Sequence, residues 1–230
     1  MNENELNFEN YLPNEQRKNN ALYSFYAAFL LCAISIIIGI YYYFELKKYA
    51  DLEIEDISTL ETVYYVSTIL FSLSIIATII FFTLWFRRAY ANLRRVGIDI
   101  ENNDSMAFWG FVIPFMNLVK PLKIAKEIDL KYDFILQKIN EEHKQNLNNY
   151  SIITAWFSVY WIDIIVSRLA NKTQFISMGQ MVEYHGYMLG SYTITLLSIG
   201  LTILMIRTIS KSETDLEQYL KLEELSAPNQ

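Results

Sequence analysis

Four long apolar runs divide the chain, and their length decides the fold class before any motif is considered. The first two, residues 21–44 and 63–86, contain no charged residue. A helix of about 20 apolar residues crosses the roughly 30 Å hydrocarbon core of a bilayer, so each run is long enough to span it. Two further runs, at about 150–170 and 187–206, have the same character but are shorter or more polar. The pattern predicts an all-α integral membrane protein, a four-helix bundle.

The polar segments complete the predicted organisation. Residues 1–20 are rich in Asn and Glu, which is typical of a flexible tail. Residues 208–230 form a second polar tail, in which Thr214 and Glu217 have the spacing of a capping box and predict the start of a short helix. The membrane domain therefore extends from 21 to 207.

Charge sets the orientation of these runs. The loops 45–62 and 171–186 contain few basic residues, whereas the segment between the second and third runs contains ten. These are Arg87, Arg88, Arg94, Arg95, Lys120, Lys123, Lys126, Lys131, Lys138 and Lys144. The positive-inside rule then places the central loop and both termini in the cytoplasm. The net charge of −6 gives no reason to expect nucleic acid as a partner.

The apolar segment 106–122 breaks the simple pattern because it contains Pro114 and Asn117 and ends at Pro121. A crossing here would put the C-terminus outside and destroy the charge bias, so we expect a re-entrant or an interfacial segment. We expect a helix break at Pro114, with the Asn117 amide bonding the freed backbone and a shallow cavity that favours an anionic lipid headgroup. Residues 121–142 have helical apolar spacing and predict a cytoplasmic amphipathic helix along the inner leaflet.

Three strings carry a family resemblance: WFRRAYANLRRVG from Trp85, WGFVIPFMNLVKPLKIAKEI from Trp109, and AWFSVYWIDIIVSRLANK from Ala155. They resemble the domain-of-unknown-function 4328 family of bacterial multi-pass membrane proteins, over roughly residues 64–207. The motif positions fall on Trp85, Phe86, Arg88, Ala89, Tyr90, Asn92, Leu93, Trp109, Pro114, Asn117, Leu118, Pro121 and Glu127. The resemblance implies the architecture and a bacterial inner membrane, and it brings no activity or cofactor. Asp163 departs from it, since a small amide or neutral residue is expected there.

The candidate site residues gather after the second run. They are Arg87, Arg88, Tyr90, Asn92, Arg94, Arg95, Trp109, Pro114, Asn117, Pro121 and Glu127. The arginines are either topology anchors or ligands for lipid headgroups. For Arg88 we expect a structural hydrogen-bond partner between Asn117 and Glu127, so that even Arg88→Lys disturbs folding.

Asp163 is the one ionisable candidate inside the membrane. It either binds a proton or cation, or reaches the external interface together with Arg168. His143 and His185 lie on opposite predicted sides, so we expect no metal site, and no catalytic constellation or cofactor is evident.

The sequence thus predicts a non-enzymatic membrane module that anchors, scaffolds or senses. The alternative is a small transporter or channel for an ion or small solute that uses Asp163 and the break near Pro114. We expect membrane lipids, with anionic headgroups at the cytoplasmic face, as partners. Protein partners and a homo-oligomer stay open.

Overall fold

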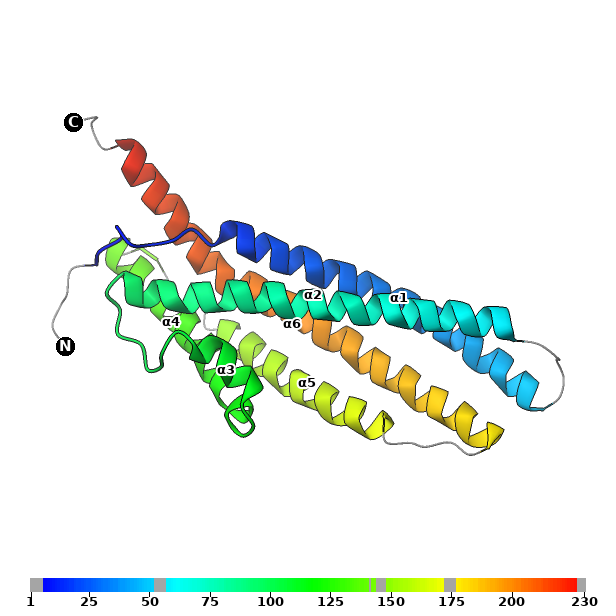
Figure 1. Ribbon diagram of the computed structural model, residues 1–230. Helices are drawn as coiled ribbons and strands as arrows, with labels where there is room; N and C mark the ends of the chain where they lie inside the picture. The colour runs from blue at the N-terminus through cyan, green and yellow to red at the C-terminus, as the bar shows by residue number, and fades with distance from the viewer. Residues whose placement is uncertain (1–5, 52–56, 141, 144–147, 172–176, 227–230) are drawn as a thin grey trace. The chain divides into compact units, whose positions relative to one another are not determined.

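The computed structural model describes residues 6–51, 57–140, 142–143, 148–171 and 177–226, without the side chains of 223, 224 and 226. Every regular element in these ranges is a helix (Figure 1). The elements are α1 (Glu15–Ala50), α2 (Ser58–Arg95), α3 (Met106–Val112), the 3-10 helix η1 (Met116–Leu118), α4 (Lys120–Ile139), α5 (Asn148–Ala170) and α6 (Met178–Ser226). Four of them, α1, α2, α5 and α6, are long and apolar enough to cross a membrane. The all-α fold is confirmed, and four helices of the described ranges have the length and apolar composition that a span requires.

The chain forms two compact units, and each long helix contributes residues to both. The first unit contains Met1–Leu22, Ile80–Phe157 and Leu204–Gln230, and the second contains Tyr23–Ile79 and Ser158–Ile203. The first unit therefore combines the start of α1, the end of α2, all of α3, η1 and α4, the start of α5 and the end of α6.

Aromatic rings and small residues hold the second unit together. The rings of Tyr42 and Tyr64 stack at 4.8 Å, and the His185 ring lies edge-on to both at 4.9 Å and 5.3 Å. At Gly39, an added Cβ would lie 2.9 Å from Leu189 Cδ2, so glycine is what allows α1 and α6 to approach here. Packing of this kind replaces the hydrophobic driving force that is missing between helices in lipid.

The end of α2 is fixed by its own sequence. Gly97 has φ 87°, a conformation that glycine adopts without strain. Its N–H donates to the carbonyl oxygen of Arg94, and the Ile98 N–H donates to that of Leu93, which is the Schellman pattern of a helix C-terminus. Arg94 and Arg95 in the last turn also complement the negative end of the helix dipole. The chain therefore leaves α2 abruptly and turns toward α3.

The segment 106–122 is broken, as its proline predicts. Helix α3 ends at Val112, Ile113 is extended as expected before a proline, and Phe115 has φ 68°. Such a conformation costs a non-glycine residue on the order of 1–3 kcal/mol. Helix α4 then starts at Lys120 with Pro121 in its first turn, where the missing N–H costs nothing. The break is confirmed, and the position of this segment at a membrane interface stays a prediction.

Both predicted tails differ from the structure. The N-terminal segment is tied down before α1 begins, since the Asn7 N–H donates to Val96 O and the Asn14 N–H to Glu217 Oε1. Residues 208–226 do not form a separate capped helix. They continue α6, and Thr214 Oγ1 donates back to Ser210 O within that helix. Residues 1–5 and 227–230 lie outside the described ranges.

Candidate functional site

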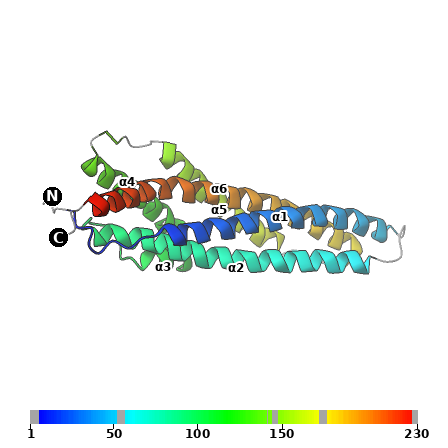
Figure 2. The same cartoon turned by 90° about the horizontal axis from the view of Figure 1, so that it is seen from above.

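A buried carboxylate at Glu213 is the centre of the first unit. Its side chain is 2% exposed and accepts hydrogen bonds from three other segments. Asn14 Nδ2 donates at 2.8 Å, Trp85 Nε1 at 3.3 Å and Tyr132 Oη at 3.3 Å. These donors come from the segment before α1, from α2 and from α4, and both views show the start of α1 beside α6 (Figures 1 and 2). One residue of α6 therefore joins four parts of the chain.

A second set of bonds fastens the N-terminal segment around this carboxylate. Glu217, one turn further along α6, accepts from Tyr11 Oη at 3.2 Å and from the Asn14 N–H at 2.7 Å. Asn92 is fully buried on α2, where its Nδ2 donates to Leu12 O at 2.8 Å. We call Asn14, Asn92, Glu213 and Glu217 the latch, because they hold the segment before α1 against α2 and α6.

The two tyrosine hydroxyls that bond to the latch carboxylates stay protonated. Burial raises the pKa of Tyr11 far above its ordinary value, and the charges of Glu213 and Glu217 raise it further. Burial also raises the pKa of Tyr132, again with help from the Glu213 charge. Both hydroxyls are therefore donors at any physiological pH, which suits them to bind carboxylates. The arrangement is structural in character, since both buried carboxylates accept hydrogen bonds from neutral donors.

Helix α4 carries two further buried acids. Asn149 Nδ2 of α5 donates to Asp129 Oδ1 at 2.9 Å, and Ser212 Oγ of α6 donates to Asp133 Oδ1 at 2.8 Å. His143 Nε2 lies 3.1 Å from the same Asp133 oxygen. Burial raises the pKa of Asp129 to about 6, with a smaller contribution from the charge of Asp133 and against the hydrogen bond from Asn149.

The predicted motif residues around Glu127 do come together. Tyr90 Oη donates to Glu127 Oε2 at 2.7 Å, and the Glu101 N–H donates to Glu127 Oε1 at 2.8 Å. The Asn102 N–H donates to Tyr90 Oη at 3.1 Å, while Lys120 Nζ donates to Asn102 Oδ1 at 2.6 Å. We call this set the lock, because it ties the end of α2 and the link 98–105 to α4.

Arg88 does not have the partner predicted for it. Tyr90 occupies Glu127 instead, and in the described ranges Arg88 has no hydrogen bond or ion pair with residues 117–127. The charges that act on it most are those of Arg17, Arg95 and Glu213. The expected partner of Arg88 lay between Asn117 and Glu127, and in the structure Glu127 of that range bonds to Tyr90, two residues after Arg88.

Of the other three arginines, two bond to nearby parts of the chain. Arg87 is exposed. Arg94 pairs with Asp104 at 3.1 Å and donates to Asn102 O, and Arg95 donates to Asn92 Oδ1 at 2.9 Å. Arg94 thus ties the end of α2 to the polar link that follows it, whereas Arg95 bonds within α2.

Asn117 does not repair the break at Pro114 as expected. Its backbone N–H donates to Ile113 O at 3.2 Å, but its half-buried side chain has no hydrogen-bond partner among the described residues. Trp109 is exposed and packs edge-on against Phe108 at 4.9 Å. The polar role expected of Asn117 is therefore wrong, because the backbone closes the turn by itself.

Asp163 lies among hydroxyl groups in the second unit. Thr195 Oγ1 of α6 donates to Asp163 Oδ1 at 2.7 Å, and Ser167 Oγ donates to the same oxygen at 3.4 Å. Ser167 Oγ also lies 3.1 Å from Ser191 Oγ. The carboxylate therefore faces α6, and Arg168 at the end of α5 is exposed.

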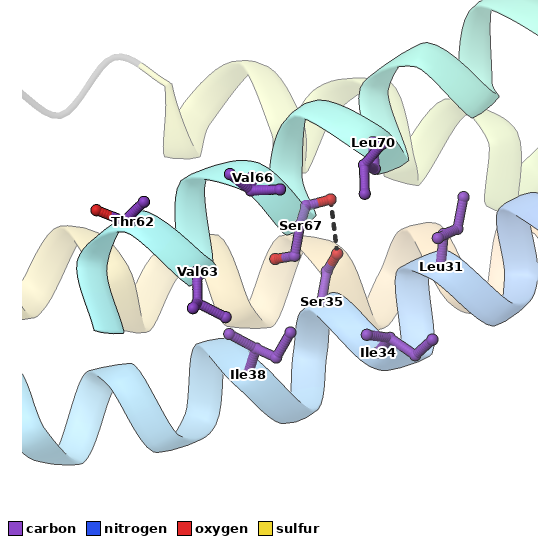
Figure 3. A pocket seen from close by; sticks show the side chains of 9 residues that line it. All are labelled: Leu31, Ile34, Ser35, Ile38, Thr62, Val63, Val66, Ser67 and Leu70. Atoms are coloured by element: carbon purple, nitrogen blue, oxygen red, sulfur yellow. Dashed lines mark hydrogen bonds between the residues drawn. The ribbon is translucent and has the colours of Figure 1, made fainter. Parts of the chain in front are cut away.

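An apolar groove of about 390 Å³ lies between α1 and α2 in the second unit (Figure 3). It is lined by Leu31, Ile34, Ser35, Ile38, Thr62, Val63, Val66, Ser67 and Leu70. Its buried hydroxyls are satisfied locally, since Ser35 Oγ donates to Ser67 O at 3.3 Å and Ser67 Oγ to Tyr64 O at 2.8 Å. The groove offers an apolar surface and no polar path for an ion. Across the described residues, no group of three or more His, Cys, Asp or Glu side chains is arranged to hold a metal ion.

The family model for a domain of unknown function (DUF4328) matches residues 49–213, which include the lock, Asp163 and Glu213. The chain belongs to this family. No curated protein and no solved structure matches it. The DUF4328 match covers α2 to α5 in full, but it begins after Asn14 and ends before Glu217, so it includes only Asn92 and Glu213 of the latch.

The sequence pointed to Asn92 but not to the other three latch residues or to the two buried acids of α4. Asn14 lies in a polar segment that reads as mobile, and Glu213 and Glu217 follow Arg207 and Lys211, as on a solvated helix. The one available signal was the i, i+4 spacing of Glu213 and Glu217, which puts them on one face of a helix together with Leu216 and Leu220.

Proposed function

We propose that the protein is a non-enzymatic module which anchors a folded polar unit at the cytoplasmic face of a bacterial cytoplasmic membrane. The four long helices supply the anchor, and the first unit supplies the surface that scaffolds or senses. The latch is the observation that carries this proposal. A fully buried carboxylate is costly unless all its partners are in place, so such a network favours one rigid arrangement of the chain over many.

Charge supports the proposed orientation. Arg87, Arg94 and Arg95 follow the apolar run of α2, and α4 adds the lysines at 120, 123, 126, 131 and 138. All of these residues belong to the first unit, which is the part expected in the cytoplasm under the positive-inside rule. Both chain termini belong to the same unit and are proposed to be cytoplasmic with it.

A small transporter or channel is the second candidate, and Asp163 is the observation that favours it. An ionisable group among hydroxyls at membrane depth is a functional candidate by default. The hydroxyls of Thr195, Ser167 and Ser191 could pass a proton or bind a dehydrated cation. The same bonds also suit a purely structural role, in which the hydroxyls offset the cost of burying the carboxylate.

A flux assay separates the two candidates. Purified protein is reconstituted into liposomes, and the uptake of protons, Na⁺ and K⁺ is compared with that of protein-free liposomes and of the Asp163→Asn variant. If the protein is a non-enzymatic module, ion uptake should be the same with the native protein, with the variant and in empty liposomes. Flux that requires the native protein and falls in Asp163→Asn would establish the transporter instead.

A further inference from the structure

Five large apolar side chains project from the broken segment of the first unit. They are Trp109, Val112, Phe115, Leu118 and Val119, which we call the wedge. Phe115 is 84% exposed, more than Ile76 on the apolar run of α2, which is 55% exposed. In water such a patch is costly, and contiguous exposed apolar surface marks an interaction site.

Aromatic contacts fix the wedge relative to the apolar run of α2. The Phe111 ring of α3 lies edge-on to Phe82 at 5.7 Å and to Phe86 at 5.8 Å. Phe82 and Phe86 are one turn apart, about 6 Å along the helix. Phe86 is the last residue before Arg87, so α3 lies beside the last apolar turn of α2.

The segment has the form of a hairpin with Phe115 at its tip. Asn102 lies before α3 and Lys120 follows η1, so their 2.6 Å hydrogen bond closes the base. A Cβ on Gly110 would lie 3.1 Å from Lys120 Cβ, so α3 packs closely on the start of α4. Figure 1 shows the chain reversing between these two helices. The positive φ of Phe115 makes this reversal and directs the exposed ring outward.

Basic residues adjoin the hairpin base. Lys120 is the first residue of α4, Lys123 and Lys126 lie on its next turns, and Arg87 follows the apolar run of α2. An apolar tip with a basic base is complementary to one leaflet of a bilayer, whose acyl chains lie beneath anionic headgroups.

We propose that the wedge is inserted among the acyl chains of the cytoplasmic leaflet, where α3 and η1 form a re-entrant hairpin that does not cross the bilayer. This inference rests on the proposed membrane placement of α2. It names the lipid as the partner of this part of the first unit, and it assigns the basic residues at the base to headgroup phosphates. The break at Pro114 then returns the chain to the side from which it entered.

Fluorescence quenching in nanodiscs tests the proposal. Single cysteines at Phe115→Cys and, separately, Val112→Cys are introduced into a Cys32→Ala background and labelled with an environment-sensitive dye. Ile76→Cys on the run of α2 is the hydrocarbon control, and exposed Glu142→Cys is the aqueous control. Quenching by lipids that carry a spin label on the acyl chain is then compared among the four positions.

We expect blue-shifted emission and strong quenching at 115 and 112, close to the values at 76, and neither effect at 142. If 76 behaves as a hydrocarbon position while both 115 and 112 behave like 142, the wedge is not inserted and the inference is overturned. If the emission and quenching at position 76 resemble those at position 142, the proposed membrane placement of α2 is itself wrong. The two wedge positions keep the test decisive where one variant does not fold.

Discussion

Replacement of Asn14 by alanine is the sharpest test of the latch. The side-chain Nδ2 donates to Glu213 Oε1 at 2.8 Å and to Trp85 O at 3.1 Å, and the substitution removes both bonds. The backbone N–H of residue 14, which donates to Glu217, is retained. The variant therefore removes a donor from a buried carboxylate and leaves the rest of the segment unchanged.

The expected loss of stability is about 2 kcal/mol. Burial raises the pKa of Glu213 to about 7, so its carboxyl is mostly charged when stability is measured at pH 8. A hydrogen bond to a charged group contributes about 1.5–3 kcal/mol, and an unsatisfied buried acceptor costs a similar amount. Loss of a helix N-cap is a competing explanation, since Asn14 directly precedes α1. That effect should be small here, because Asn14 Oδ1 accepts no hydrogen bond from the described residues and so does not cap the helix. Most of the lost stability should therefore come from the network around Glu213.

Two readouts and one matched control complete the experiment. Asn7→Ala makes the same chemical change at an exposed position of the same segment, and we expect it to alter stability by less than about 0.5 kcal/mol. For Asn14→Ala, the midpoint of thermal unfolding should fall by on the order of 5 °C. Trypsin should also cleave faster at Arg17 and Lys18. Equal midpoints and equal cleavage rates for the two variants would refute the latch.

Two further predictions concern the acids of the first unit. The pKa of Asp129 is about 6 in the folded protein and 3.8 ordinarily, so the folded state binds the proton more tightly. Protonated Asp129 therefore stabilises the folded state. Its contribution to the free energy of unfolding is complete below about pH 4 and is lost as the pH rises through 6, a decrease of up to about 3 kcal/mol. Asp129→Asn should flatten this dependence in thermal unfolding between pH 4 and 8, and an unchanged slope would contradict the assignment. For the lock, Tyr90→Phe should cost about 2 kcal/mol, whereas Arg88→Lys should cost little, because the Tyr90 side chain, and not that of Arg88, bonds to Glu127. The opposite order of the unfolding midpoints would contradict this assignment.

The sequence predicted those parts of the fold that depend on local pattern. The four spans follow from apolar length alone, and the break at Pro114 follows from the ring of proline. Pro121 at the start of α4 also obeys a local rule. The end of α2 near Gly97 obeys another, but the apolar pattern, which ends at Phe86, did not predict it. These features need no knowledge of which segments meet.

The latch could not be predicted because it depends on contacts between distant parts of the chain. Asn14 and Glu213 are 199 residues apart, and each has the composition of a solvated surface. The error at Arg88 has a similar origin. The spacing placed Arg88 and Tyr90 near the same turn, and only the direction of each side chain decides which one reaches Glu127.

Cysteine labelling in intact cells tests the central claim, which is a cytoplasmic first unit carried by four crossing helices. Glu142 and Thr59 are both exposed in the structure, Glu142 just after α4 in the first unit and Thr59 at the start of α2 in the second. Each is replaced by cysteine in a Cys32→Ala background and treated with a membrane-impermeant maleimide before and after lysis. We expect position 59 to react in intact cells and position 142 to react only after lysis. Reaction of position 142 in intact cells would contradict it.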